Sequence, residues 1–125
     1  WLEARTALLI GRLRHGAAAM QARDVLAMAT REGAACLGRA GELGVLAVGA
    51  AGDVAVWPQE GIPFAGALSD PIEAWLRCGP TSTRHTVVGG HALVENGELR
   101  LDGVDDMLAR HRNASARLQA VMGAA

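Results

Sequence analysis

Histidine is the first side chain to consider for chemistry, because imidazole titrates near neutral pH and is the commonest metal ligand in proteins. The chain has four histidines, scattered along it at His15, His85, His91 and His111. They form neither a His-x-His pair nor a His-Glu-x-x-His helix, two spacings that bring ligands to one metal ion. Zinc needs three or four convergent ligands. The histidine spacing therefore predicts no metal site.

His85 and His91 are the two histidines that a hairpin would bring toward each other. They flank Gly89-Gly90, a pair that accepts the positive φ angles of a two-residue β-turn. Counting outward from that turn, residue 88 faces residue 91 and residue 85 faces residue 94. The two imidazoles are then diagonal at best, so an ordinary surface role is favoured over a metal site.

Asp53 is the carboxylate with the most suggestive position, directly after Gly52 and before an apolar run. A carboxylate there could be catalytic, and a small enzyme using Asp53, His85 and His91 is one hypothesis. An Asp in a turn more often accepts hydrogen bonds from backbone amides. This structural role is the favoured interpretation.

A nucleophile has no better support. No serine lies in a Gly-x-Ser-x-Gly elbow; the serines considered are Ser69, Ser82 and Ser115. Cys36 and Cys78 lie in apolar helical contexts, which predicts buried free thiols. The glycine-rich run 49–52 lacks the Lys-Ser/Thr pair of a phosphate loop. The residues by themselves therefore assign no catalytic, cofactor-binding or metal-binding side chain.

Composition narrows the classes of partner. The 125 residues carry 12 basic and 13 acidic side chains, and half are hydrophobic. No basic patch interleaved with aromatic residues is present, which argues against nucleic-acid binding. No apolar run approaches the roughly 18 residues of a membrane-spanning helix. We expect one compact domain in the cytoplasm, with neither a nucleic-acid nor a membrane partner.

The helices that would position these side chains follow from apolar spacing and capping residues. Leucines at positions 2, 8, 9 and 13 predict a helix over 2–15, ended by Gly16. A three-four spacing predicts a second helix over 22–37. Ser69 or Asp70, followed by Pro71, predicts the start of a third helix. We expect Asp102 to cap the last one, with a buried stripe that comprises Val104, Met107, Leu108, His111, Leu118, Val121 and Met122.

The strands are predicted from a change of period and from turn residues. Residues 45–48 and 54–57 read as two strands around the turn at 49–52. Residues 83–88, 91–95 and 98–101 read as a three-stranded meander with turns at Gly89-Gly90 and Asn96-Gly97. The order is two helices, two strands, a helix, three short strands and a helix. A boundary is expected near residues 38–44.

Three stretches resemble the amidohydrolase superfamily. Residues 29–38 with Glu42-Leu43-Gly44-Val45-Leu46 are similar to the end of its catalytic barrel, and Gly49-Ala50-Ala51-Gly52-Asp53-Val54 resembles its Gly-x-x-Ala-Asp pattern, with Gly52 in place of alanine. The run 87–99 resembles the asparagine-glycine hairpin of the same family. Within the superfamily, residues 12–16, 66–78 and 108–111 are most similar to 8-oxoguanine deaminases and to the hydroxydechloroatrazine ethylaminohydrolase type.

The resemblance implies a mixed α and β fold. Residues 1–40 would be the last helices of an incomplete (β/α)8 barrel, and residues 41–125 part of a β-sandwich flanking domain with a C-terminal helix. It implies a zinc or iron ion in the complete enzyme, which would activate water to release ammonia from a purine- or triazine-like ring. The family's metal ligands and its glutamate acid/base precede the segment that matches Trp1. None is therefore carried over to this sequence.

Two hypotheses follow. The leading one is a catalytically incomplete portion of a metal-dependent aminohydrolase, with no metal of its own in residues 1–125. The alternative is a stand-alone structural or oligomerising module without enzymatic activity. Both predict self-association through exposed apolar surface, with the helix at 2–15 and the small-residue face of the helix at 22–37 as candidate surfaces.

Overall fold

The helical part of the molecule comes first in the chain. The computed structural model describes residues 1–123. Helix α1 (Leu2–His15) ends at Gly16, whose φ of 93° is left-handed, as predicted. Helix α2 (Ala22–Ala27), the π-helical turn η1 (Met28–Glu32) and helix α3 (Gly33–Cys36) follow without a break and together form the second predicted helix.

Helix α4 (Pro71–Arg77), which corresponds to the third predicted helix, follows a short 3-10 turn, η2 (Ile62–Phe64). Asp70 caps α4, because its carboxylate accepts hydrogen bonds from the backbone amides of Ile72 and Glu73, both at 3.0 Å. Proline at the first helical position lacks the amide that would otherwise be unpaired. The cap predicted from Asp70 and Pro71 is therefore confirmed.

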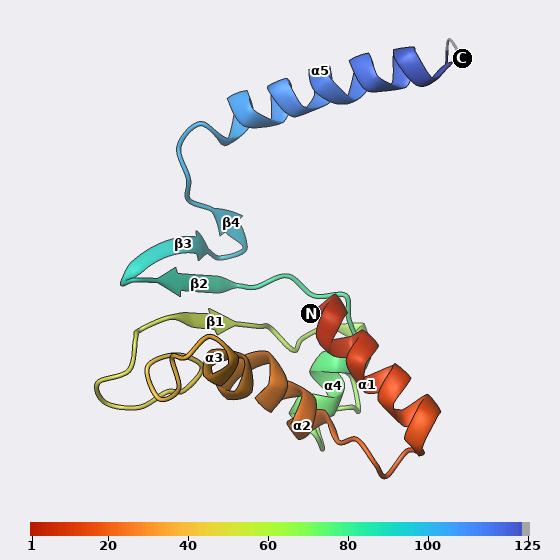
Figure 1. The fold of residues 1–125 in the computed structure, drawn as a ribbon, viewed down its shortest axis with the longest axis vertical. Coiled ribbons are helices and arrows are strands. Elements are labelled where there is room, and N and C mark those ends of the chain that lie inside the picture. Colours follow the sequence, from red (N-terminus) through yellow and green to blue (C-terminus); the bar gives the residue numbers. More distant parts are fainter. Residues whose placement is uncertain (124–125) are drawn as a thin grey trace.

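An antiparallel sheet lies beside the helices, as Figure 1 shows. Within residues 1–123 its strands are β1 (Val54–Val56), β2 (His85–Val88), β3 (His91–Glu95) and β4 (Glu98–Leu99), in that spatial order. The two predicted hairpin turns are confirmed. The predicted register holds for Val88 opposite His91 and for Val87 opposite Ala92, and then shifts by one residue, because an irregularity between Thr86 and Val87 pairs Thr86 with Val94.

The strand predicted over 45–48 is wrong. Gly44, just before this segment, lies against the π-helical turn, where a Cβ would stand 2.5 Å from the Thr30 carbonyl carbon, and the chain then leaves the turn with Leu46 and Val48 exposed. The backbone of this segment enters a turn, in which the Ala50 amide donates to the Ala47 carbonyl at 3.1 Å. A β-strand needs a neighbouring strand to accept and donate its hydrogen bonds. Residues 45–48 have no such neighbour among the described residues.

The hydrophobic core is small and joins α1, α2 and α4. Its buried members are Ala4, Leu8, Ala22, Val25 and Leu76. Of the leucines that predicted α1, Leu8 is buried, whereas Leu2, Leu9 and Leu13 are exposed. The inner face of α1 carries Ala4, Leu8 and Gly11, and the small residues among them let the helices approach closely. The other leucines of α1 face outward.

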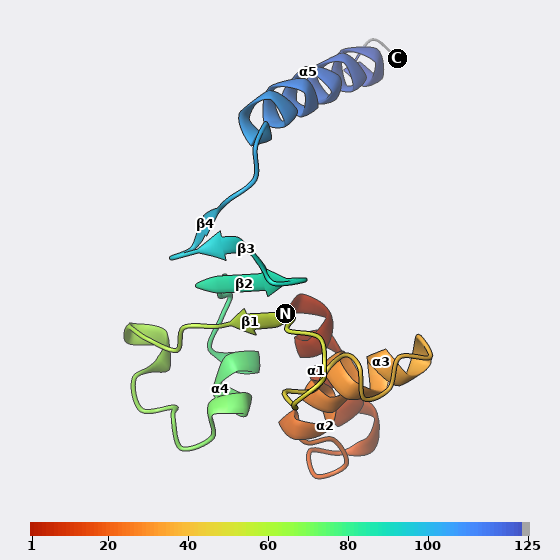
Figure 2. The same cartoon turned by 90° about the vertical axis from the view of Figure 1, so that its left-hand side faces the viewer.

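Helix α5 (Val104–Gly123) stands clear of the rest of the structure on the segment 100–103, as Figure 2 shows from a second side. None of its residues is buried, so the predicted buried stripe is wrong. The helix begins at Val104, so Gly103 rather than Asp102 precedes its first residue. No helix among residues 1–123 is both long and apolar enough to cross a membrane.

The chain exposes more surface than its size requires. Its accessible surface is 9116 Å², whereas a compact monomer of this length exposes roughly 6,300 Å². The isolated helix α5 and the exposed leucines of α1 contribute to this excess. The fold therefore presents surfaces that a compact domain would bury.

Candidate functional site

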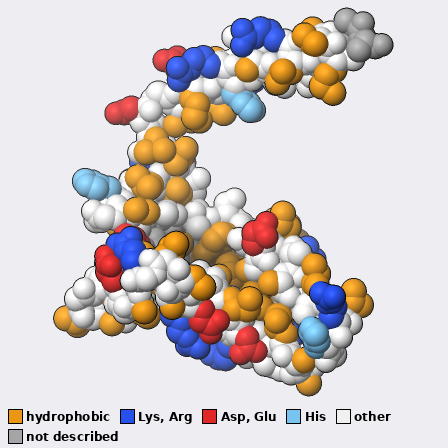
Figure 3. All heavy atoms as spheres, viewed as in Figure 1, with side chains coloured by type: hydrophobic (Ala, Val, Ile, Leu, Met, Phe, Trp, Pro, Cys, Tyr) orange, Lys and Arg blue, Asp and Glu red, His pale blue; other side chains and the backbone are white. Residues whose placement is uncertain are grey.

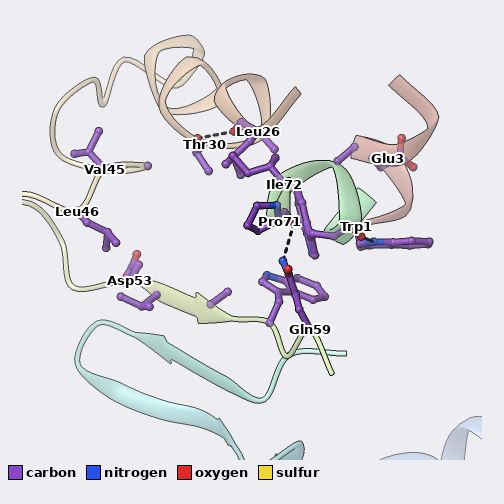
Figure 4. A pocket seen from close by; sticks show the side chains of 17 residues that line it. Trp1, Glu3, Leu26, Thr30, Val45, Leu46, Asp53, Gln59, Pro71 and Ile72 are labelled. Atoms are coloured by element: carbon purple, nitrogen blue, oxygen red, sulfur yellow. Dashed lines mark hydrogen bonds between the residues drawn. The ribbon is translucent and has the colours of Figure 1, made fainter. Parts of the chain in front are cut away.

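A groove of about 660 Å³ lies between the helices and strand β1. Its walls come from α1, α2, the segment 44–46, β1 and the start of α4, as Figure 4 shows at close range. Figure 3 shows hydrophobic side chains gathered in the hollow between the helical part and the sheet. The groove brings together residues from both halves of the described chain and is therefore the candidate site.

Three tryptophans line one end of the groove. The indole nitrogen of Trp1 donates a hydrogen bond to the Trp75 carbonyl at 2.6 Å. The Trp57 and Trp75 rings pack with centroids 5.6 Å apart and planes inclined by 59°. Arg5 places its guanidinium 5.4 Å from the centre of the Trp1 ring, a cation–π arrangement. These contacts fix the ends of α1 and α4 against the segment that follows β1.

Three polar side chains of the groove wall, at Thr30, Gln59 and Asp53, are paired within the protein, and the wall also holds the Glu3 carboxylate. The Thr30 hydroxyl, in the π-helical turn, donates to the Leu26 carbonyl of α2 at 2.6 Å. The Gln59 side-chain amide donates to the Pro71 carbonyl at 2.8 Å. A group already paired in this way must lose a hydrogen bond before it can bind a ligand. The wall thus combines apolar side chains with the Glu3 carboxylate, which could meet a polar or charged group.

Asp53 also lines the groove and has a structural partner. Its carboxylate accepts a hydrogen bond from the Gly89 backbone amide at 2.8 Å. Gly89 belongs to the turn between β2 and β3, so this bond joins the start of β1 to the neighbouring hairpin. The predicted amide-accepting role is confirmed, although the amide lies 36 residues away and not in the Asp53 turn itself.

The histidines do not assemble a metal centre. His85 lies on β2 and His91 on β3, where His91 pairs with Val88. Among residues 1–123, no group of three or more His, Cys, Asp or Glu side chains could hold a metal ion. Three convergent ligands are the minimum for a zinc site, so the side chains of the described region do not fit one.

The remaining candidate nucleophiles are dispersed. Cys36 is exposed and Cys78 half-buried, so the prediction of buried thiols is wrong. Cys36 ends α3, where Ala34 is the buried residue, and Cys78 follows the last residue of α4. Both sit at helix ends, where few neighbouring elements cover them. The structure brings neither thiol into the groove, nor does it bring the three candidate serines there: Ser69, Ser82 and Ser115.

An ion pair that the sequence did not reveal joins α1 to α4. The Arg12 guanidinium donates to both carboxylate oxygens of Glu73, at 2.6 and 2.8 Å, and Arg77 approaches the same carboxylate at 3.3 Å. The hydrogen bond from Arg12 holds the pKa of Glu73 below its usual value. The partners lie 61 residues apart, and no local pattern marks such a pair. Because the pair joins two helices of the core, we assign it a structural role.

The chain belongs to the amidohydrolase family, whose sequence profile it matches over residues 1–93. It is 37% identical over 117 residues to the 8-oxoguanine deaminase of Pseudomonas aeruginosa, covering 94% of this chain and 26% of that protein. It is 40% identical over 89 residues to the hydroxydechloroatrazine ethylaminohydrolase of Pseudomonas sp. (strain ADP), covering 70% of this chain and 18% of that protein. The predicted family resemblance is confirmed.

Solved structures agree with this assignment. A triazine hydrolase variant is 34% identical, with a TM-score of 0.74 over 86% of this chain and 24% of its own. A mutant atrazine chlorohydrolase from Arthrobacter aurescens, solved with zinc and atraton, has a TM-score of 0.75. The mixed α and β architecture with an antiparallel sheet is that of an amidohydrolase segment. The chain spans about a quarter of the length of the 8-oxoguanine deaminase that it matches (26%).

Proposed function

We propose that this chain is a C-terminal, structural part of a metal-dependent aminohydrolase that removes ammonia from a purine- or triazine-like ring. The observation that carries the proposal is the 37% identity over 94% of this chain to an 8-oxoguanine deaminase. The triazine hydrolase and atrazine chlorohydrolase structures extend the same relationship to triazine rings. In this proposal residues 1–40 supply the last barrel helices and residues 41–125 part of a flanking β-sandwich and the terminal helix.

The proposal gives these residues a supporting role. The side chains described between residues 1 and 123 do not fit a metal site, and the candidate acid Asp53 holds a backbone amide. What the chain offers instead is a set of fixed contacts, such as the Arg12–Glu73 pair between α1 and α4. We therefore propose that catalytic groups and the zinc or iron ion belong to the part of the enzyme that this chain does not span.

A chimera tests the proposal. The 117 matched residues of the Pseudomonas aeruginosa deaminase are replaced by this chain, and ammonia release from 8-oxoguanine is measured. We expect the chimera to fold and to release ammonia, while this chain alone has no activity. A deaminase from which the same segment is simply deleted is the matched negative control. Deamination by the isolated chain, or an unfolded chimera, would overturn the proposal.

A variant of the chimera separates this proposal from the rival small enzyme. Replacing both His85 and His91 with alanine removes the two candidate ligands of the hairpin. His91 is exposed and His85 half-buried at the sheet, so folding should tolerate both changes. We expect an unchanged rate of ammonia release. A loss of rate with retained folding would assign these histidines a catalytic role.

A further inference from the structure

We propose that Asn96 is a site of spontaneous chemical modification, at which the side-chain amide is lost as ammonia and replaced by a carboxylate. Asn96 and Gly97 form the two-residue turn between β3 and β4, and both residues are exposed. Asparagine followed by glycine favours this reaction, because glycine has no side chain to hinder its attacking backbone nitrogen. The reaction needs only water and is independent of the function proposed above.

The reaction begins when the Gly97 backbone nitrogen loses its proton to hydroxide and attacks the side-chain carbonyl carbon of Asn96. A bond forms between these two atoms, the bond from that carbon to the side-chain nitrogen breaks, and the nitrogen leaves as ammonia with a proton from water. Water then opens the cyclic imide at either of its carbonyl groups. The product is aspartate, or isoaspartate, in which the main chain runs through the former side chain.

One hydrogen bond holds the attacking nitrogen in the folded chain. The Gly97 amide donates to the Arg84 carbonyl at 2.9 Å, so hydroxide cannot take its proton until that bond opens. Space does not limit the reaction, because a Cβ built on Gly97 would meet no atom of residues 1–123 within 4 Å. Turns of this kind open locally without global unfolding. We therefore expect the bond to slow the reaction about five-fold relative to the unfolded chain.

The two products differ in whether the turn can keep its shape. Among residues 1–123, Asn96 is the one non-glycine residue with a positive φ, at 51°. Aspartate tolerates this left-handed conformation as asparagine does. Isoaspartate adds a carbon to the main chain, so it no longer fits a two-residue turn, whose length sets the register of the hairpin.

Strand β4 is the element that isoaspartate would release. It is two residues long and lies at the edge of the sheet, where Glu98 pairs with Glu95. A new carboxylate at position 96 would also stand between these two glutamates. Both of them share Arg100, at 3.3 and 3.2 Å. The modification therefore weakens the pairing that anchors the segment leading to α5.

Mass spectrometry of the whole chain tests the site. The chain is kept in mildly alkaline buffer, folded or unfolded in urea, and then digested with trypsin, which releases the turn within the peptide 85–100. The chain's other asparagine, Asn113 in α5, precedes alanine and is the internal control. We expect Asn96 to convert in both samples, about five-fold more slowly in the folded chain, and Asn113 to convert far more slowly than Asn96 in urea. Failure of Asn96 to react in the folded chain by the time the unfolded chain has reacted completely would overturn the proposal. Conversion of both asparagines at one rate in urea would do the same, and equal rates for Asn96 in the two samples would overturn the role of the Gly97–Arg84 bond.

Hydrogen exchange tests the consequence for β4. The Arg100 amide donates to the Leu93 carbonyl at 2.8 Å and reports on the pairing of the two strands. The variant Asn96→Asp carries the new charge without the extra main-chain carbon, so it is the matched control for the isoaspartate form separated by chromatography. We expect the Arg100 amide to exchange several-fold faster in the isoaspartate form than in Asn96→Asp, which should remain close to wild type. Equal exchange in the two forms would overturn the proposed release of β4.

Discussion

Replacement of Gly44 by alanine should destabilise the fold far more than the same change at Gly38. Both glycines have a φ of +72°, so both substitutions force alanine into the left-handed region. That strain costs roughly 1 to 2 kcal/mol and is partly offset by a gain of about 0.4 to 1 kcal/mol from the stiffer unfolded chain. Gly38→Ala should therefore cost about 1 kcal/mol.

The two sites differ in what the added methyl group meets. A Cβ at Gly38 has no atom within 4 Å. A Cβ at Gly44 would stand 2.5 Å from the Thr30 carbonyl carbon, 2.6 Å from its oxygen and 2.7 Å from the Arg31 nitrogen. These are backbone atoms of a helical turn and cannot rotate away, so the segment must lift by about 1 Å. Overpacking of this kind costs about 1 to 3 kcal/mol beyond the left-handed strain.

Chemical denaturation of the isolated chain, followed by circular dichroism, measures both variants. We expect Gly44→Ala to lose about 2 to 4 kcal/mol in total and Gly38→Ala about 1 kcal/mol. Because φ is matched, the difference between the variants reports the contact with Thr30 alone. Equal losses would refute the argument, since they would mean that the segment containing Gly44 does not pack on the helix.

Two further predictions concern single hydrogen bonds. Glu73→Gln should lower the free energy of unfolding by about 1 to 2 kcal/mol at pH 7, because it removes the charged acceptor of Arg12. Because the pKa of Glu73 is lowered in the folded state, the ion pair contributes fully to stability above the usual carboxyl pKa of about 4.3, and this contribution is lost as the pH falls through the folded-state pKa. Urea unfolding at pH 7 and pH 3 should therefore show a difference between Glu73→Gln and wild type that shrinks in acid. A difference that stays constant with pH would contradict the ion pair as its cause. Asp53→Ala should cost about 1 kcal/mol and speed hydrogen exchange of the Gly89 amide, whereas unchanged exchange would show that the bond between them does not hold the hairpin.

Local features of the fold were predictable because their causes lie within a few residues. The end of α1 at Gly16 and the cap of α4 by Asp70 depend on backbone groups of the adjacent turn. The turn at Gly89-Gly90 depends on its own φ angles, 57° and 81°. In each case the residue type restricts the backbone directly.

Features that depend on a distant partner were not predictable. The apolar run 45–48 has the composition of a strand, yet no strand pairs with it in the described chain, and Gly44 just before it packs on the π-helical turn instead. The spacing of apolar residues in α5 indicates a buried face, but no element of the described chain covers it. A hydrophobic pattern specifies which face prefers to leave water and not what lies opposite.

The candidate site also has features that the sequence predicted and features that only the tertiary structure revealed. The sequence identified the family through its motifs, and it indicated an amide-accepting role for Asp53. It gave no sign that Trp1, Trp57 and Trp75 meet at one groove, or that Arg12 reaches Glu73 61 residues away. Side chains so far apart in the chain become neighbours only when the helices pack. No spacing rule within the chain records that contact.

The sequence by itself thus determined the family, the positions of most helices and hairpin turns, and the scattering of histidines that argues against a metal site. The tertiary structure alone decided which apolar faces are covered, where the groove lies and which of its polar side chains the protein itself pairs. The physical reason is the distance along the chain over which each interaction acts. Backbone preference and capping act between near neighbours, whereas burial depends on the elements that pack across from a residue, and the sequence does not state which elements those are.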